Sequence, residues 1–184
     1  MVSRSAKDKT VSAELKTAWN EKGLYIAVTV HKAGFHPAER STARLWDGDS
    51  LQIAFDPLRN ARKRNMKYDG DDFEYFFGMF KGGPVVYRAR ASLSLYDSLD
   101  KATGELTGNE VPLAVKSSIG KTVYEMMFVP RTVSPFKLKA GSSMCFNLIV
   151  NLNDGKKRLG WLELTPGIGQ YKNPGEFIDL VLLP

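Results

Sequence analysis

Cysteine and histidine, which build many catalytic and metal centres, are scarce in this sequence. Its 184 residues include one cysteine and two histidines. A single cysteine excludes an intramolecular disulfide, and Cys145, within the apolar run 144–150, is predicted to be a buried, unreactive thiol. His31 and His36 have no further ligands at zinc spacing. Because no nucleophile elbow, phosphate-binding loop or dinucleotide fingerprint is present either, we expect no enzymatic activity.

Long hydrophobic runs are also missing. The mean hydropathy is -0.26, and no segment reaches the roughly 18 consecutive apolar residues that read as a membrane span. Residues 2–10 are polar and charged, unlike the apolar centre of a secretory leader. We therefore expect no membrane partner, and we expect the sequence to begin within a longer protein.

Acidic residues are fewer than basic ones, which gives a formal net charge of +6. An excess of basic residues is typical of proteins that bind nucleic acids. The densest basic run in this sequence is 59–67. This run lies between Asp56-Pro57 and the acidic segment 69–72, which predicts a solvated loop between two strands. No nucleic-acid-binding motif accompanies it, so we expect no nucleic-acid partner.

Alternating apolar residues are what the chain has in abundance. Leu51, Ile53 and Phe55 occupy every second position, the period of a strand with one face in a core. Segments 13–19 and 24–30 form a predicted hairpin. Further expected strands are 73–80, 85–91, 114–119, 122–129, 144–151 and 178–183. Without amphipathic helices, the pattern predicts one all-β domain over 1–184, an antiparallel two-sheet sandwich of the jelly-roll or immunoglobulin-like kind.

Trp46 stands on the turn that precedes the strand 51–55. The neighbouring Asp47-Gly48 favours an exposed turn, where a flat ring can meet a ligand. The alternative is a tryptophan packed in the core.

Four carboxylates gather within a short segment, namely Asp69, Asp71, Asp72 and Glu74. Calcium prefers such oxygen ligands, so Asp69, Asp71 and Asp72 are a candidate metal site. The alternative is a charged hairpin opposite the basic residues 62–64.

Six segments resemble, in the same order, the family 9 carbohydrate-binding modules and their wider DOMON-like superfamily. They are WNEKGLY at 19–25, LWDGDSLQIAFD at 45–56, DDFEY at 71–75, VYE at 123–125, FNLIVN at 146–151 and YKNPGEFIDL at 171–180. The resemblance implies a β-sandwich in which Trp19 and Tyr25 pack in the core. It also implies a strand before residue 19, and since its usual Ile-Asp-Gly motif is not found, we expect an open sheet edge there.

The resemblance implies that two aromatic rings sandwich a terminal sugar unit, and these positions fall on Trp46 and Tyr171. A rim of polar side chains completes the family's site around the sugar. One of these positions, a carboxylate in the family, is Gln52 here, which can still bond a hydroxyl. Three rim positions are apolar here: Phe76, Ile149 and Ile168. By position, substitutes for the lost rim are Glu74, Asn147 and Asn151. A loop that covers the apolar rim, a less polar ligand or a docked domain are the alternatives.

The expected function is that of a non-catalytic accessory module of a secreted polysaccharide-processing protein, extracellular or periplasmic. Its expected partners are an oligo- or polysaccharide and neighbouring domains of a larger chain, with calcium as a candidate cofactor. One rival is an interaction domain with a decayed sugar site, whose partner surface lies around Phe76 and Ile149. A second rival is a haem-binding relative, with axial ligands among Met79, Met126, Met127 and lysines.

Overall fold

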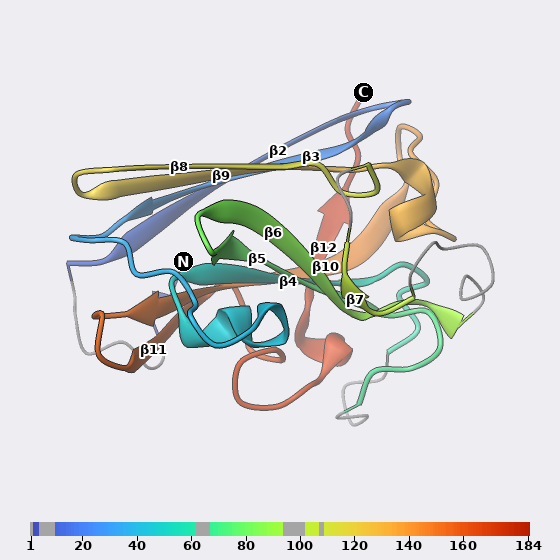
Figure 1. Cartoon of the computed structure of the whole chain (residues 1–184). Coiled ribbons are helices and arrows are strands. Elements are labelled where there is room, and N and C mark those ends of the chain that lie inside the picture. The colour runs from blue at the N-terminus through green and yellow to red at the C-terminus, as the bar shows by residue number, and fades with distance from the viewer. Residues whose placement is uncertain (1, 4–9, 62–66, 94–101, 107–108) are drawn as a thin grey trace.

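Two antiparallel sheets pack face to face in the computed structural model, which describes residues 2–3, 10–61, 67–93, 102–106 and 109–184 (Figure 1). The large sheet runs in the order β1 (Val2–Ser3), β11 (Arg158–Glu163), β10 (Ser143–Asn153), β4 (Ser50–Asp56), β5 (Phe73–Phe80), β6 (Gly83–Arg90) and β7 (Gly104–Glu105), and β12 (Ile178–Val181) also pairs with β10. The small sheet is β2 (Ser12–Asn20), β3 (Gly23–His31), β9 (Lys121–Phe128) and β8 (Leu113–Ser118). The predicted all-β, two-sheet antiparallel sandwich is confirmed.

In the part of the chain that the structure describes, helical structure is limited to short 3-10 turns. They are η1 (Thr42–Asp47), η3 (Pro130–Val133) and η4 (Pro174–Glu176). Among the described residues, no helix is both long and apolar enough to cross a membrane.

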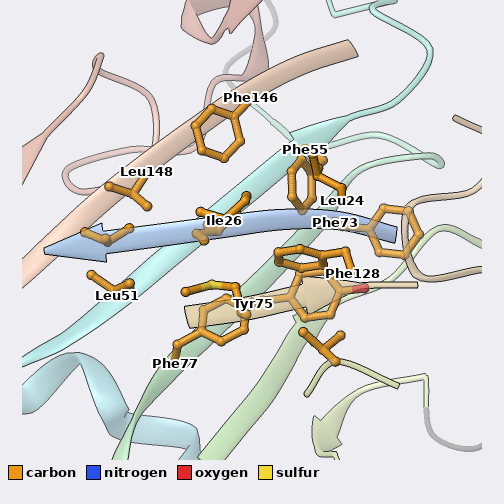
Figure 2. Packing of buried hydrophobic residues seen from close by; sticks show 14 of the residues in the cluster. Leu24, Ile26, Leu51, Phe55, Phe73, Tyr75, Phe77, Phe128, Phe146 and Leu148 are labelled. Atoms are coloured by element: carbon orange, nitrogen blue, oxygen red, sulfur yellow. The ribbon is translucent and has the colours of Figure 1, made fainter. Parts of the chain in front are cut away.

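Aromatic rings from both sheets fill the space between them (Figure 2). Phe128 of the small sheet lies 4.9 Å from Phe55 and 5.3 Å from Tyr75 of the large sheet, measured between ring centroids. The ring centroid of Phe77 is 5.7 Å from that of Phe128. Burial of each such side chain stabilises the fold by roughly 1.5–3 kcal/mol, and the edge-to-face geometry suits the ring quadrupoles. The predicted inward alternation of β4 is therefore confirmed.

Of the expectations about single strands, one is confirmed and two need correction. Trp19 packs against the core as the resemblance implied, and its Nε1 donates to the Leu183 carbonyl at 2.8 Å. The expected open edge is covered in part, because Val2 and Ser3 of β1 pair with Glu163 and Leu162 of β11, itself a strand that was not predicted. Tyr25 instead points to the outer face of the small sheet, because its neighbour Leu24 takes the inward position.

Cys145 is half-buried rather than fully buried. Its Sγ donates to Asp179 Oδ1 at 3.8 Å. Burial, followed by the nearby charge of Asp56, raises the pKa of the Cys145 thiol to about 11. The thiol is therefore protonated at neutral pH, in keeping with the predicted low reactivity.

The outer face of the large sheet is covered by η1 and by the segment 164–177, which lie on the same side of it (Figure 1). Asn147 of β10 anchors this segment, because its Nδ2 donates to the carbonyls of Thr165 and Pro166 at 3.0 and 2.8 Å. Ile168 lies down on the sheet with 1% of its surface exposed. Asn147, one of the predicted rim substitutes, is thus fully used to hold the covering segment.

Asp49, between η1 and β4, joins four parts of the chain. Its Oδ2 accepts from Lys32 Nζ at 2.9 Å and from the His36 backbone N at 2.8 Å. Its Oδ1 accepts from the Asn153 backbone N at 2.9 Å. Its carbonyl accepts the Tyr124 hydroxyl of the small sheet at 3.3 Å. Both side chains of the Lys32–Asp49 pair are largely buried, at 9% and 7% exposed.

Asp49→Ala leaves the Lys32 ammonium buried without its partner and removes the acceptor of two backbone N–H groups. We expect a loss of about 3–5 kcal/mol in the free energy of unfolding, measured by urea denaturation. The exposed Glu14, 3.2 Å from His31, provides the control, and Glu14→Ala is expected to leave stability nearly unchanged. Equal effects of the two substitutions would contradict the role given to Asp49.

Candidate functional site

Trp46 lies in η1, just before β4 as predicted, and the structure places it over the outer face of the large sheet. The ring is half-buried and packs against a small apolar cluster of Ala38, Leu45 and Phe76. Gly48 fixes this turn, because a Cβ there would lie 2.3 Å from the Ala38 backbone N. The indole is therefore held on a rigid support with part of its surface open.

Arg158, at the start of β11, stacks between two tryptophans. Its guanidinium carbon is 5.6 Å from the centroid of Trp46 and 4.8 Å from that of Trp161. Arg44 also lies over Trp46, at 4.8 Å. Burial lowers the pKa of Arg158 from its ordinary value. Neither Arg158 nor Trp161 was predicted as a site residue.

Gln52 and Asn151 form a hydrogen-bonded network beneath this stack. Gln52 Nε2 donates to Asn151 Oδ1 at 3.3 Å, and Asn151 Nδ2 donates to Ser50 Oγ at 3.1 Å. Arg158 Nη2 donates to the same Asn151 oxygen at 2.8 Å. Gln52 is 6% and Asn151 0% exposed, so the network is buried. It positions Arg158, and Arg158 links these two predicted polar residues to Trp46.

Tyr171 and Glu74 belong to a second part of the same face. The Tyr171 hydroxyl donates to Glu176 Oε2 at 3.0 Å. Lys172 Nζ donates to Glu74 Oε1 at 2.5 Å. Phe76 of β5 pairs with Gln52, and Glu74 lies two residues away along the same strand. The part with Glu74 is therefore roughly 7 Å along β5 from the part with Gln52.

The apolar rim residues lie in the sheet and are covered. Ile149, Gln52 and Phe76 are direct cross-strand neighbours on β10, β4 and β5. Ile168 of the covering segment packs with Ile149 and Ala54 in one buried cluster. The alternative in which a loop covers the apolar rim is therefore the one that the structure adopts.

The acidic cluster differs in membership from the predicted one. Asp56, Asp71 and Asp72 each offer an oxygen within 4.8 Å of the others, and all three are buried. Asp69 is exposed, and its Oδ1 accepts from the Asp71 backbone N at 3.3 Å. Asp56 takes its place because it ends the neighbouring β4 strand, a proximity that sequence spacing does not reveal. The basic residues 62–64 of the alternative interpretation lie outside the described residues.

Burial dominates the acid–base behaviour of this cluster. It raises the pKa of Asp72 to about 8 and that of Asp71 to about 6. Asp72 Oδ1 is buried without a hydrogen-bond partner among the described residues. Three clustered carboxylates with an unpartnered buried oxygen fit a hard divalent cation such as calcium.

Two methionines of the haem interpretation, Met126 and Met127, lie on opposite faces of one strand. Met126 is 3% exposed inside the sandwich. Met127, its neighbour on β9, faces the opposite side of the small sheet and lines a hollow there. Adjacent residues of one strand cannot ligate one iron from the same side.

Comparison with known proteins gives one family. The model of the carbohydrate family 9 binding domain-like proteins matches residues 1–183. The search of curated proteins finds no match.

Two solved structures with the same fold are complexes of a family 9 carbohydrate-binding module from Caldicellulosiruptor kristjanssonii. The glucose complex is 18% identical, with a TM-score of 0.70 over 98% of this chain and 82% of that chain. The cellotriose complex is 19% identical, with a TM-score of 0.68 over 98% of this chain and 80% of that chain. At this identity the likeness shows the shared sandwich fold.

The raised pKa of Asp72 predicts how stability varies with pH in metal-free buffer. In the unfolded chain Asp72 ionises near 3.8, whereas in the folded protein it holds its proton to about 8. The folded state therefore binds more protons between these values, and the free energy of unfolding should fall as the pH rises from about 4 to about 8.

Urea unfolding across this pH range, with a chelator present, measures the effect. Asp72→Asn should flatten the decline and make the protein more stable than the parent at pH 8. Glu125→Gln, on an exposed carboxylate of the small sheet, should keep the decline. A parent protein whose stability rises over this range would contradict the burial argument.

Proposed function

Since the chain belongs to the carbohydrate family 9 binding domain-like family, we propose that it is a non-catalytic carbohydrate-binding module in which a sugar stacks on Trp46. A pyranose has an apolar C–H face and a polar rim, and a flat indole accepts the apolar face. Trp46 is partly exposed on a turn that the Gly48 contact holds in place. A sugar that stacks on the ring would replace the Arg44 guanidinium, which lies over it at 4.8 Å. A platform that is rigid before binding loses little entropy when the ligand arrives.

The polar groups beside Trp46 would serve the rim of the sugar. Gln52 bonds to Asn151 in a buried network that holds Arg158. Gln52, the more exposed of the two at 6%, is the member that a sugar hydroxyl would reach. Tyr171 and Glu74, on the second part of the face, would contact a further unit of an oligosaccharide. The observation that carries this proposal is the partly exposed ring of Trp46 on a family member's fold.

The module's role would be to hold a polysaccharide near an enzyme carried by the same protein. Tethering raises the effective concentration of substrate without chemistry of its own. We place the protein outside the cytoplasm, in a polysaccharide-processing system, and expect neighbouring domains in the same chain. The buried, internally bonded state of Asp49 supports a structural rather than a catalytic carboxylate in the Trp46 turn.

Calcium is the proposed cofactor, held by Asp56, Asp71 and Asp72. When bound, it would supply the positive charge that these buried carboxylates lack and so fix the loop after β4 to the start of β5. Asp69 would support the site from outside through its backbone N, which donates to Asp72 Oδ2 at 2.5 Å.

Trp46→Ala should abolish or weaken sugar binding at least about tenfold, because the stacking surface is removed. Isothermal titration calorimetry with a panel of mono- and oligosaccharides measures this change. Tyr25→Ala provides the control, because Tyr25 is a half-buried ring on the outer face of the other sheet. Sugar binding that survives Trp46→Ala but is lost in Tyr25→Ala would move the site to the small sheet.

Millimolar calcium should raise the Tm by several degrees, because a ligand of the native state stabilises it by mass action. Asp72→Asn should remove the response, whereas Asp69→Asn should keep it. A Tm that is the same with calcium and with chelator would exclude the metal site.

A further inference from the structure

A hollow of about 420 Å³ lies between the segment 36–40 and the turn that joins β10 to β11. Trp46 lies behind its lining, where the Arg158 guanidinium is 5.6 Å from the indole centroid. The volume of the hollow is within the range of small-molecule sites. Its cationic lining residues are Arg40, Lys156, Lys157 and Arg158, and His36 lies among them. The carboxylates in the lining are Glu39 and Asp47. The hollow therefore carries a surplus of positive charge.

Asp47 offsets only part of this surplus, because it is shared between Arg40 of the lining and Arg44 outside it. Its Oδ2 accepts from Arg44 Nε at 2.8 Å and lies 4.0 Å from Arg40 Nη1. Glu39 is exposed on the rim. The remaining cations therefore have a potential that attracts an anion into the hollow.

Arg158 is the deepest of these cations, and the charge of Asp47 acts on it only from beyond ion-pair distance. It is half-buried between Trp46 and Trp161, and its Nε has no hydrogen-bond partner among the described residues. Within that same part of the chain, no acidic side chain lies within ion-pair distance of it. A desolvated cation without a counter-ion is costly, and a ligand carboxylate would supply the missing charge.

The walls of the hollow are fixed before any ligand arrives. Gly155 has φ +86°, and a Cβ there would lie 2.9 Å from His36 Nδ1, so the two walls meet at this glycine. Asn153 Nδ2 donates to the Asp47 carbonyl at 2.7 Å and ties the turn to η1. Arg158 is held by its hydrogen bond to Asn151 and by cation–π contacts with the indoles of Trp46 and Trp161. This arrangement is a preorganised cationic site rather than a chance gap between side chains.

We propose that this hollow binds the carboxylate of an acidic sugar unit, with Arg158 as the anion-binding group and Trp46 as the platform for the pyranose ring. The inference rests on the proposed sugar-binding function and names its ligand class. A guanidinium matches the plane of a carboxylate and can bond both of its oxygens. A neutral sugar offers Arg158 no counter-charge, so the site should discriminate by charge. Lys156 and Lys157, on the exposed rim, would attract the anion over a longer range.

The test is a calorimetric comparison of methyl glucuronide with methyl glucoside, which differ in the carboxylate. The parent protein should bind the glucuronide at least about tenfold more tightly, and added salt should reduce the difference. Arg158→Gln should remove the preference for the glucuronide over the glucoside. Lys121→Gln, an exposed charge on the small sheet, is the matched control and should keep the preference.

Because Arg158 also packs between two tryptophans, its substitution can disturb the fold. The double variant Lys156→Gln with Lys157→Gln leaves that stack intact and should weaken glucuronide binding several-fold at unchanged glucoside affinity. Equal affinity for the two glycosides, or tighter binding of glucose 6-sulfate than of the glucuronide, would overturn the carboxylate site while sugar binding by Trp46 stands. Absence of binding to every sugar in the panel, in a folded parent protein, would overturn both proposals.

Discussion

The buried Lys32–Asp49 ion pair is the interaction on which the arrangement of the site depends. A carboxylate withdrawn from water must have its lone pairs satisfied, and the donors that satisfy Asp49 come from segments far apart in sequence. Its position therefore fixes the segment before η1, the end of β10 and, through Tyr124, the small sheet at one point. Trp46 and Arg158 each lie a few residues from this point, so their separation is set by the same contacts.

Most of the sandwich could be predicted from the sequence because each strand carries its own signal. Leu51, Ile53 and Phe55 alternate, and the turn at Gly120 separates two runs that pair as β8 and β9. The strand β11 was missed because Gly160 interrupts its apolar pattern, with φ +124°, and the register shifts beside it between Leu152 and Asn153. β1 was missed because two residues are too few to show a period.

The site could be predicted only in part, for a different physical reason. Trp46 and Gln52 belong to one continuous segment, so their proximity can be read from the chain. Arg158 reaches Trp46 only because β10 and β11 form a hairpin beside β4, and nothing in its own neighbourhood marks it as more than a basic turn. The same limitation applies to Asp56, which joins the acidic cluster across a sheet rather than along the chain.

The covering segment 164–177 leaves β11 and returns to β12, and both of these strands pair with β10. Its ends are therefore held by one strand, while its interior crosses the outer face of the large sheet. Leu164, at its start, packs against the core between the sheets. The Asn147 contacts and the packing of Ile168 on Ile149 hold the part that follows. In evolutionary terms, residues can be inserted or exchanged in this segment without repacking the aromatic core, so ligand preference can diverge among descendants faster than the sandwich that carries it.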